Sequence, residues 1–176
     1  MDKRPMEICI VSDLHLGTFG CQAQEVLNYL KSIEPKTLIL NGDIIDIWQF
    51  KKHYFPAAHM QVIKQIFSLL SKGTKVYYIT GNHDEALRRY TDLEMGGFTL
   101  TDKVVLDLDG KKTWIFHGDI FDATTKVQID AAKIRVFDEK KNELDGFTQF
   151  VATQSVQVMG LFTEDVKMQS HQFQPA

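Results

Sequence analysis

Four short apolar segments of this sequence each end in a cluster of polar and acidic residues. The clusters begin at Asp13, Gly42, Gly81 and His117, and successive clusters are roughly 30–40 residues apart, the length of one strand–helix–strand unit. In open parallel sheets, ligands bind outside the carboxyl ends of the strands. We therefore expect the four clusters to meet at one edge of a sheet.

The stretches between the clusters alternate between strand-like and helix-like patterns. The expected strands cover 8–11, 37–40, 75–80, 103–108 and 113–116. The expected helices cover 21–33, 57–70 and 83–90, with Pro35 ending the first. Asp109-Gly110 is a hairpin turn signal between the last two strands. The alternation predicts parallel strands and the hairpin adds antiparallel ones, so we expect an α/β fold with mixed β-sheets flanked by helices.

The length of the chain and its residue composition predict how it is organised into domains. A chain of 176 residues with 44% hydrophobic and 24% charged residues is typical of one globular domain. We expect residues 1–126 to form the core of that domain. Residues 127–176, which show no clean helical stripe, are expected to form a divergent C-terminal segment of the same domain.

Charge, cysteines and hydropathy exclude several classes of protein. The net charge of −3 gives no electrostatic footprint for nucleic acid. Two cysteines, Cys9 and Cys21, are too few for a disulfide framework or a cysteine-based zinc site. The apolar run at 8–11 is far shorter than a signal-peptide core or a membrane span. We therefore expect a cytoplasmic protein.

The side chains in the four clusters are metal-ligand types. Carboxylate, imidazole and amide groups suit Mn²⁺, Fe²⁺, Zn²⁺ or Mg²⁺. Gathering Asp13, Asp43 and several histidines at one edge is costly without a cation, because their charges would be desolvated and the two carboxylates would repel each other. Each cluster alone is a weak signal, since Asp, Gly and His are common in loops. All four together, in order and at strand ends, predict a site for two cations that share a carboxylate.

The four clusters resemble the first four motifs of the calcineurin-like metallophosphoesterases. They read Asp13-Leu-His15, Gly42-Asp43-Ile-Ile-Asp46, Gly81-Asn82-His83-Asp84 and His117-Gly118-Asp119. The resemblance covers about residues 6–126. Within that family, the residues of the first and fourth motifs are similar to those of bacterial UDP-2,3-diacylglucosamine diphosphatases of lipid A synthesis.

The resemblance implies a role for each matching residue. Asp13 and His15 would hold the first metal, Asn82 and His117 the second, and Asp43 would bridge both. His83 would stabilise the transition state or protonate the leaving oxygen, and Asp84 would orient His83. The expected cofactors are two divalent cations, manganese first, with iron or zinc as alternatives. The implied mechanism is in-line attack on phosphorus by a water that the metals activate.

The resemblance also implies a substrate, and the alternatives stay open. A phosphoester or nucleotide-lipid substrate is expected, with cleavage of UDP-2,3-diacylglucosamine to the lipid 1-phosphate and UMP as the specific reaction. A second interpretation is a phosphodiesterase or phosphatase that acts on a soluble substrate. A third is a catalytically impaired scaffold, because the family's fifth motif, Gly-His-x-His, does not occur in this sequence. His171 stands in a loosely similar string and is the only histidine after His117.

Two weaker features concern the substrate. Arg88, just after the third motif, could bind a substrate phosphate, although a solvated helix face is the commoner role for such a residue. Aromatic residues interleaved with lysines near 48–55, together with Phe19, could contact a lipid or a membrane surface. Packing under a loop is the alternative for this aromatic cluster. Peripheral contact with the inner face of a membrane is therefore one expectation.

Overall fold

The computed structural model describes the backbone of residues 3–47 and 54–121 and of five short segments, 129–130, 133–134, 149–153, 157–161 and 169–172. Side chains are described up to residue 119. None of the helices in these ranges is long and apolar enough to cross a membrane.

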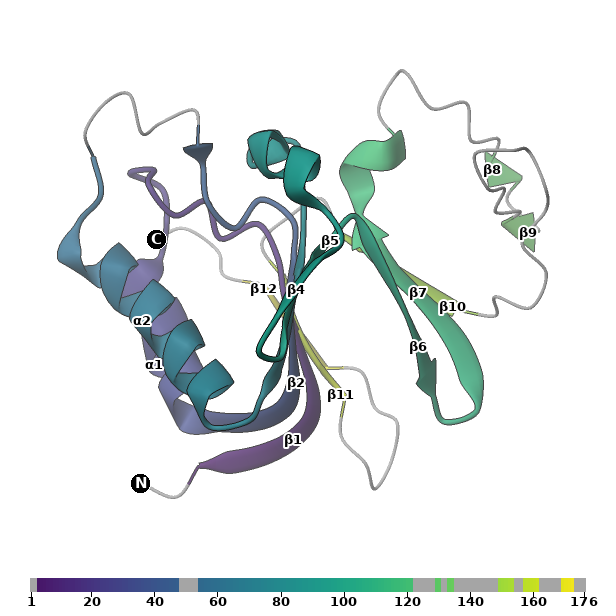
Figure 1. The fold of residues 1–176 in the computed structure, drawn as a ribbon, viewed down its shortest axis with the longest axis horizontal. Coiled ribbons are helices and arrows are strands. Elements are labelled where there is room, and N and C mark those ends of the chain that lie inside the picture. The colour runs from purple at the N-terminus through teal and green to yellow at the C-terminus, as the bar shows by residue number, and fades with distance from the viewer. Residues whose placement is uncertain are drawn as a thin grey trace.

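The centre of the fold is a seven-stranded mixed sheet (Figure 1). Its strands, in spatial order, are β12 (Gln169–Gln172), β11 (Gln157–Leu161), β1 (Arg4–Val11), β2 (Ile33–Asn41), β3 (Lys75–Ile79), β5 (Phe98–Thr101) and β4 (Leu93–Met95). Strands β1, β2, β3 and β5 run parallel, while β11 and β4 pair antiparallel to their neighbours. Three of the four polar clusters therefore follow adjacent parallel strands, as the sequence predicts.

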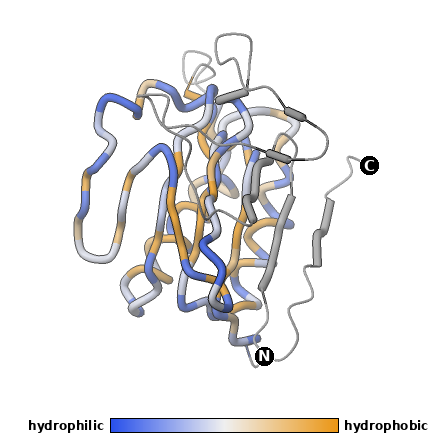
Figure 2. The backbone as a smooth tube through the Cα atoms, turned by 90° about the vertical axis from the view of Figure 1, so that its right-hand side faces the viewer, coloured by the Kyte–Doolittle hydropathy of each residue, from blue (hydrophilic) through white to orange (hydrophobic). Residues whose placement is uncertain are grey.

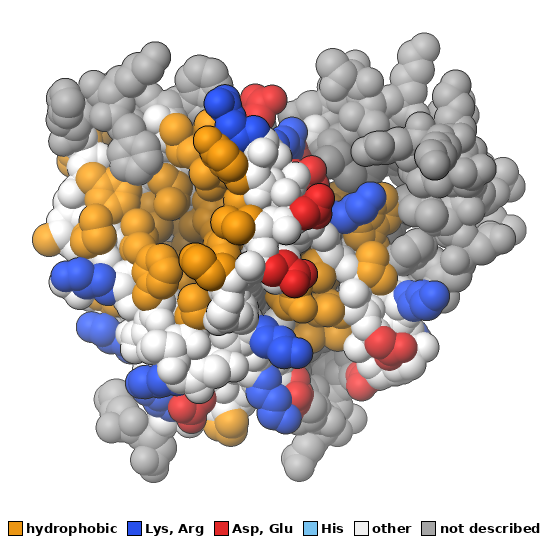
Figure 3. Space-filling model, viewed as in Figure 1, with side chains coloured by type: hydrophobic (Ala, Val, Ile, Leu, Met, Phe, Trp, Pro, Cys, Tyr) orange, Lys and Arg blue, Asp and Glu red, His pale blue; other side chains and the backbone are white. Residues whose placement is uncertain are grey.

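Two helices cover one face of this sheet, α1 (Ala23–Ser32) and α2 (Ala57–Ser71) (Figure 1). Alternate residues of β1 and β2, such as Cys9, Val11 and Leu38, pack with their buried stripes. Helix α2 is apolar beyond its buried stripe. Its Met60 and Phe67 are exposed, and apolar side chains gather on this side of the molecule (Figure 3).

A second, three-stranded sheet covers the other face. It consists of β6 (Lys103–Leu108), β7 (Lys111–His117) and β10 (Gln149–Thr153), and a separate pair joins β8 (Ile129–Asp130) to β9 (Lys133–Ile134). Buried isoleucines pack between the sheets: Ile8, Ile10, Ile39, Ile79 and Ile115. Apolar residues thus run along the inner strands (Figure 2), because these strands are buried on both faces. The expected α/β fold with mixed sheets flanked by helices is confirmed.

Three local expectations differ from the structure. The first helix ends at Ser32 and β2 begins at Ile33, so Pro35 lies inside a strand and does not end the helix. The expected helix at 83–90 is a 3₁₀ helix, η2 (Glu85–Tyr90). The β4–β5 hairpin was not predicted, although Gly96-Gly97 between its strands is a turn signal, and both glycines have positive φ. The predicted Asp109-Gly110 turn is present between β6 and β7.

Candidate metal centre

The loops after β1, β2, β3 and β7 meet at one edge of the molecule, as the spacing of the clusters predicts. The backbone N–H groups of Asp13 and His15 donate to the carbonyl oxygens of Gly42 and Asp43 at 3.0 and 2.9 Å. The N–H of Gly42 donates to the carbonyl of Ile79 at 2.9 Å. These bonds continue the β1–β2–β3 hydrogen-bond ladder beyond the strands. They therefore fix the positions of the first two loops relative to each other.

The fourth loop comes from the second sheet, and the side chain of Asn41 connects it to the first. Asn41 Nδ2 donates to the carbonyl of Phe116 at 3.0 Å, while the backbone carbonyl of Asn41 lies 3.0 Å from His117 Nδ1. A carbonyl only accepts, so Nδ1 carries the proton. This bond directs Nε2 of His117 toward Asp43, at 3.5 Å from Oδ2, and leaves Nε2 as the nitrogen that can bind a cation.

Three of the expected ligands hold the backbone in the left-handed region. The φ angles of Asp13, His15 and Asp43 are +53°, +48° and +54°. Non-glycine residues rarely adopt this conformation, and it costs on the order of 1 kcal/mol or more per residue. Such strain concentrates at functional sites, where neighbouring structure over-determines it.

Two glycines allow the loops to come this close. A Cβ on Gly42 would lie 2.2 Å from Cγ and Nδ1 of His117. A Cβ on Gly81 would lie 2.3 Å from Asp43 Oδ1. Both distances are far below van der Waals contact, so any side chain at either position would displace a residue of the site.

Asp43 lies at the centre of the site. Its Oδ1 accepts from the N–H of His83 at 2.8 Å, and its Oδ2 lies 3.9 Å from His15 Nε2 and 3.5 Å from His117 Nε2. Burial opposes its ionisation, but the bonds from His117 and His83 outweigh this and hold the pKa of Asp43 below its usual value. Asp43 is therefore an ionised carboxylate with one oxygen between two imidazoles.

The donor set fits a cation. Burial raises the pKa of Asp13, and its Oδ2 is buried without a hydrogen-bond partner. An unpaired buried carboxylate oxygen is costly, and a cation would offset that cost. Asp13, Asp43 and His117 each offer a ligand atom within 4.8 Å of the others, and so do His15, Asp43 and His83. Asn82 lines the same open cavity of about 310 Å³.

These groupings consist of histidine and aspartate side chains alone, so the expected place of Asn82 beside His117 stays a prediction. Around the shared Asp43, one group contains Asp13 and His117, and the other contains His15 and His83. The pairing of Asp13 with His15 at the first metal also stays a prediction. The rings of His15 and His83 meet edge to face, with centroids 4.6 Å apart. Asp43 belongs to both groups, as a shared carboxylate should.

The expected pairing of Asp84 with His83 is wrong. The side chain of Asp84 is fully buried, where its Oδ2 accepts from the Tyr78 hydroxyl at 2.6 Å and from the Ile44 N–H at 3.1 Å. Its Oδ1 accepts from the Gly81 N–H. Asp84 therefore ties the second and third loops together. The carboxylate beside His83 is that of Asp46, whose Oδ2 lies 3.0 Å from His83 Nδ1.

Arg88 lies behind the site and is absent from the cavity lining. Its guanidinium pairs with Asp119 Oδ2, and its Nε donates to Thr80 Oγ1 at 3.3 Å. Burial raises the pKa of Asp119, against the effect of Arg88. Asp119 lines the cavity, although its place in the fourth cluster predicted no role for it.

Some expectations fall on residues that are not described. Trp48 and Phe50 lie outside the described residues, as do 51–53. For His171 only the backbone is described: it lies in β12, level with Val158 of β11, which in turn lies level with Val11. Phe19 is described and is 80% exposed.

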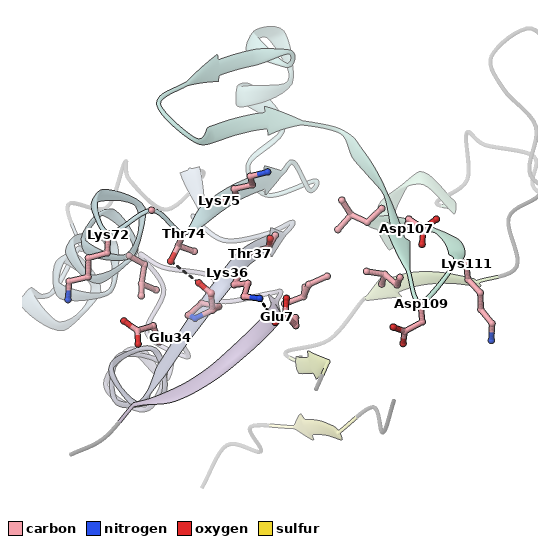
Figure 4. A pocket seen from close by; sticks show the side chains of 16 residues that line it. Glu7, Glu34, Lys36, Thr37, Lys72, Thr74, Lys75, Asp107, Asp109 and Lys111 are labelled. Atoms are coloured by element: carbon pink, nitrogen blue, oxygen red, sulfur yellow. Dashed lines mark hydrogen bonds and ion pairs between the residues drawn. The ribbon is translucent and has the colours of Figure 1, made fainter. Parts of the chain in front are cut away.

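A larger hollow of about 900 Å³ lies at the opposite edge, beside the amino ends of β2 and β3 and the β6–β7 turn (Figure 4). Its charged lining is mixed in sign, and Lys36 there pairs with Glu7 at 2.6 Å. No histidine or cysteine is among its lining residues within the described part of the chain. We therefore place the functional site in the smaller cavity, where the buried donors converge.

The comparison with protein families agrees with this geometry. The calcineurin-like phosphoesterase model matches residues 6–162. The chain belongs to this family. The match continues past residue 126 and includes β10 and all of β11, one strand from each of the two larger sheets.

Curated relatives and a solved structure are also similar. UDP-2,3-diacylglucosamine hydrolase from Aliivibrio fischeri is 32% identical over 117 residues, covering 65% of this chain and 48% of the relative. The protein of that name from Neisseria gonorrhoeae is 32% identical over 113 residues, covering 62% and 47%. A structure described as a novel archaeal phosphodiesterase aligns over 94% of this chain and 99% of its own with 15% identity and a TM-score of 0.47. The chain spans about half the length of these curated relatives.

Cation binding by this family member should depend on pH through His117. Burial alone would lower its pKa, but the Asp43 carboxylate beside it raises the pKa to about 9. A cation must therefore displace a proton from Nε2, so its affinity should rise by about tenfold per unit between pH 7 and 9 and level off above. Calorimetric titration of Mn²⁺ in buffers of different ionisation enthalpy measures that proton release. Constant affinity across this range would contradict the assignment of Nε2.

Proposed function

We propose that this chain is the catalytic core of a metal-dependent phosphoester hydrolase that uses two divalent cations. One observation carries the proposal: a single oxygen, Asp43 Oδ2, lies between His15 Nε2 and His117 Nε2 at 3.9 and 3.5 Å. A carboxylate shared between two metal positions is the arrangement that dinuclear hydrolases need. Asp13, His15, Asn82 and His117 would complete the donor set.

When bound, the cations would neutralise charge on the phosphoryl group and lower the pKa of a coordinated water. Manganese is the proposed metal, with iron or zinc as alternatives, because the donors are oxygen and imidazole nitrogen. The strained backbone at Asp13, His15 and Asp43 presets these donors, which reduces rearrangement when the cations bind.

His83 is the proposed general acid. A carboxylate accepts, so the 3.0 Å contact with Asp46 Oδ2 fixes a proton on Nδ1 of His83 and leaves Nε2 to give a proton to the leaving oxygen. To act as the acid, His83 would enter the step with a second proton on Nε2, which passes to the leaving oxygen. The side chain of His83 is 39% exposed, so it can reach a substrate bound in the open cavity.

The proposed substrate is UDP-2,3-diacylglucosamine, cleaved to the lipid 1-phosphate and UMP. The names of the curated relatives support it. The exposed ring of Phe19, which stacks on Tyr54 with centroids 3.8 Å apart, offers an apolar contact for acyl chains on the loop that follows His15. We place the reaction in the cytoplasm, at the inner membrane face where such a lipid would be held.

Two alternatives remain distinct from this substrate. A phosphodiesterase or phosphatase on a soluble substrate would use the same donors. A catalytically impaired scaffold is favoured by one observation, the absence of Gly-His-x-His from the 176 residues.

Metal analysis and product analysis separate these functions. The proposed enzyme should bind two Mn²⁺ per chain and release UMP from UDP-2,3-diacylglucosamine, as measured by mass spectrometry. Hydrolysis of bis(p-nitrophenyl) phosphate without UMP release would favour the soluble substrate. Folded protein that binds no metal when it is supplied would leave only the scaffold.

A further inference from the structure

Asp119 has the same unusual feature as the expected ligand Asp13. Each carboxylate has one oxygen, Asp13 Oδ2 and Asp119 Oδ1, that is buried without a hydrogen-bond partner. The side chain of Asp119 is only 5% exposed. Both residues line the same cavity, together with Asn82, His83 and His117. Asp119 therefore belongs to the wall of the metal centre and carries a buried oxygen without a partner.

The other oxygen of Asp119 is fixed from behind. Asp119 Oδ2 pairs with the Arg88 guanidinium, and Arg88 also contacts Thr80 Oγ1 and Asp102 Oδ1 at 3.3 and 3.7 Å. Thr80 in turn donates to Asp102 at 2.6 Å. The Arg88 guanidinium orients the carboxylate and offsets part of the cost of burying its charge. It satisfies one oxygen of Asp119 and leaves the other, Oδ1, buried without a hydrogen-bond partner.

We propose that Asp119 is a further metal-holding residue, whose Oδ1 supplies an oxygen to the cation held by Asp43 and His117 while Arg88 fixes Oδ2. The inference rests on the proposed function, since it needs the dinuclear centre. Two arguments carry it. A purely structural ion pair does not explain why Oδ1 is buried unpaired, because such an orphan is costly. Octahedral manganese sites favour oxygen ligands, and Asp119 lines the same cavity as Asp43 and His117.

The assignment gives Arg88 a role that differs from the one expected from sequence. Its guanidinium is committed to Asp119, so it acts as a positioning residue for a metal-holding carboxylate. Asp102 provides a matched control. It pairs with the same arginine from the other side, but its side chain is 54% exposed and it is absent from the cavity lining.

The test compares Mn²⁺ binding to the wild-type chain and to three variants by calorimetric titration, with site occupancy followed by electron paramagnetic resonance. Asp119→Asn should weaken one of the two sites by about tenfold or more, the usual effect of losing a group around a metal. The other site should stay within about twofold, and Asp102→Asn should leave both unchanged. Asp119→Glu keeps the charge but moves the oxygen, so it should weaken the same single site. Thermal unfolding of the metal-free variants checks that each one folds.

Three results would overturn the inference. Two sites of wild-type affinity in folded Asp119→Asn would remove Asp119 from the centre while leaving the proposed function intact. Equal weakening by Asp119→Asn and Asp102→Asn would show a general charge effect. A wild-type chain that binds no cation would overturn the proposed function itself, and this role with it.

Discussion

Replacing Asp43 by asparagine should abolish phosphodiester hydrolysis, with a loss of at least about 10³-fold in kcat/KM, because both cations would lose their shared ligand. The substitution removes the negative charge from Oδ2, the atom between His15 and His117. It retains an Oδ1 that can accept from the His83 N–H, so the loop should keep its conformation. Bound Mn²⁺, measured by metal analysis after gel filtration, should fall from two per chain to fewer than one.

The control for this experiment is Asp107→Asn, which changes an aspartate on β6 away from the cavity. It removes the same charge, and both its metal content and its activity should match the wild type. If the Asp43→Asn variant still bound two cations tightly, Asp43 would not be the ligand that the two cations share.

His83→Ala should lower kcat by about 10²–10⁴-fold, the usual contribution of a general acid, while metal content stays near that of the wild type. The reason is that the proposed role of His83 is proton transfer to the leaving oxygen. A nitrophenol leaving group needs less protonation than an alcohol. The decrease in kcat caused by His83→Ala should therefore be smaller for an aryl diester than for an alkyl phosphodiester. The ratio of these two decreases in kcat is the quantity to measure.

Asp46→Asn separates orientation of this histidine from chemistry. Asparagine keeps an acceptor for Nδ1–H of His83 but removes the carboxylate from beside the ring. We expect a loss of about tenfold in kcat and little change in KM, smaller than for His83→Ala. Loss of a cation in His83→Ala would instead assign His83 to the group that it forms with His15 and Asp43.

The convergence of the loops could be predicted because it follows from parallel topology. Asp13, Asp43 and Asn82 follow adjacent parallel strands, and periodicity with spacing is enough to align those strand ends. The arrival of His117 from a second sheet was not predicted. It depends on the isoleucine layer between the sheets and on the Asn41 side chain, which bonds to Phe116 at a separation of 75 residues in the chain.

The partner of His83 could not be read from the sequence for a related reason. Asp84 is its neighbour in the chain, but the buried hydroxyl of Tyr78 and two backbone N–H groups take up that carboxylate. Asp46 reaches the ring from another loop, which the N–H of Ile47 holds against the His83 carbonyl at 3.3 Å. Proximity in sequence favoured the wrong aspartate, and only the packed loops distinguish the two.

Asp119 was also missed, for a different reason. It belongs to the fourth cluster, but nothing in the sequence pattern shows that one of its oxygens would be buried without a partner. That property depends on Arg88, which occupies the other oxygen from the end of η2. The distinction between a turn aspartate and a site carboxylate therefore appears only in three dimensions.

The left-handed backbone at Asp13, His15 and Asp43 lowers the stability of the fold while it holds the side chains needed for activity. Glycine at any of the three would relieve its strain, by about 1 kcal/mol in a metal-free chain. Laboratory selection for heat resistance alone, without added metal, would thus favour variants that have discarded these donors. Such variants would keep the fold and lose the activity. Activity could be kept only by selecting for turnover in every round.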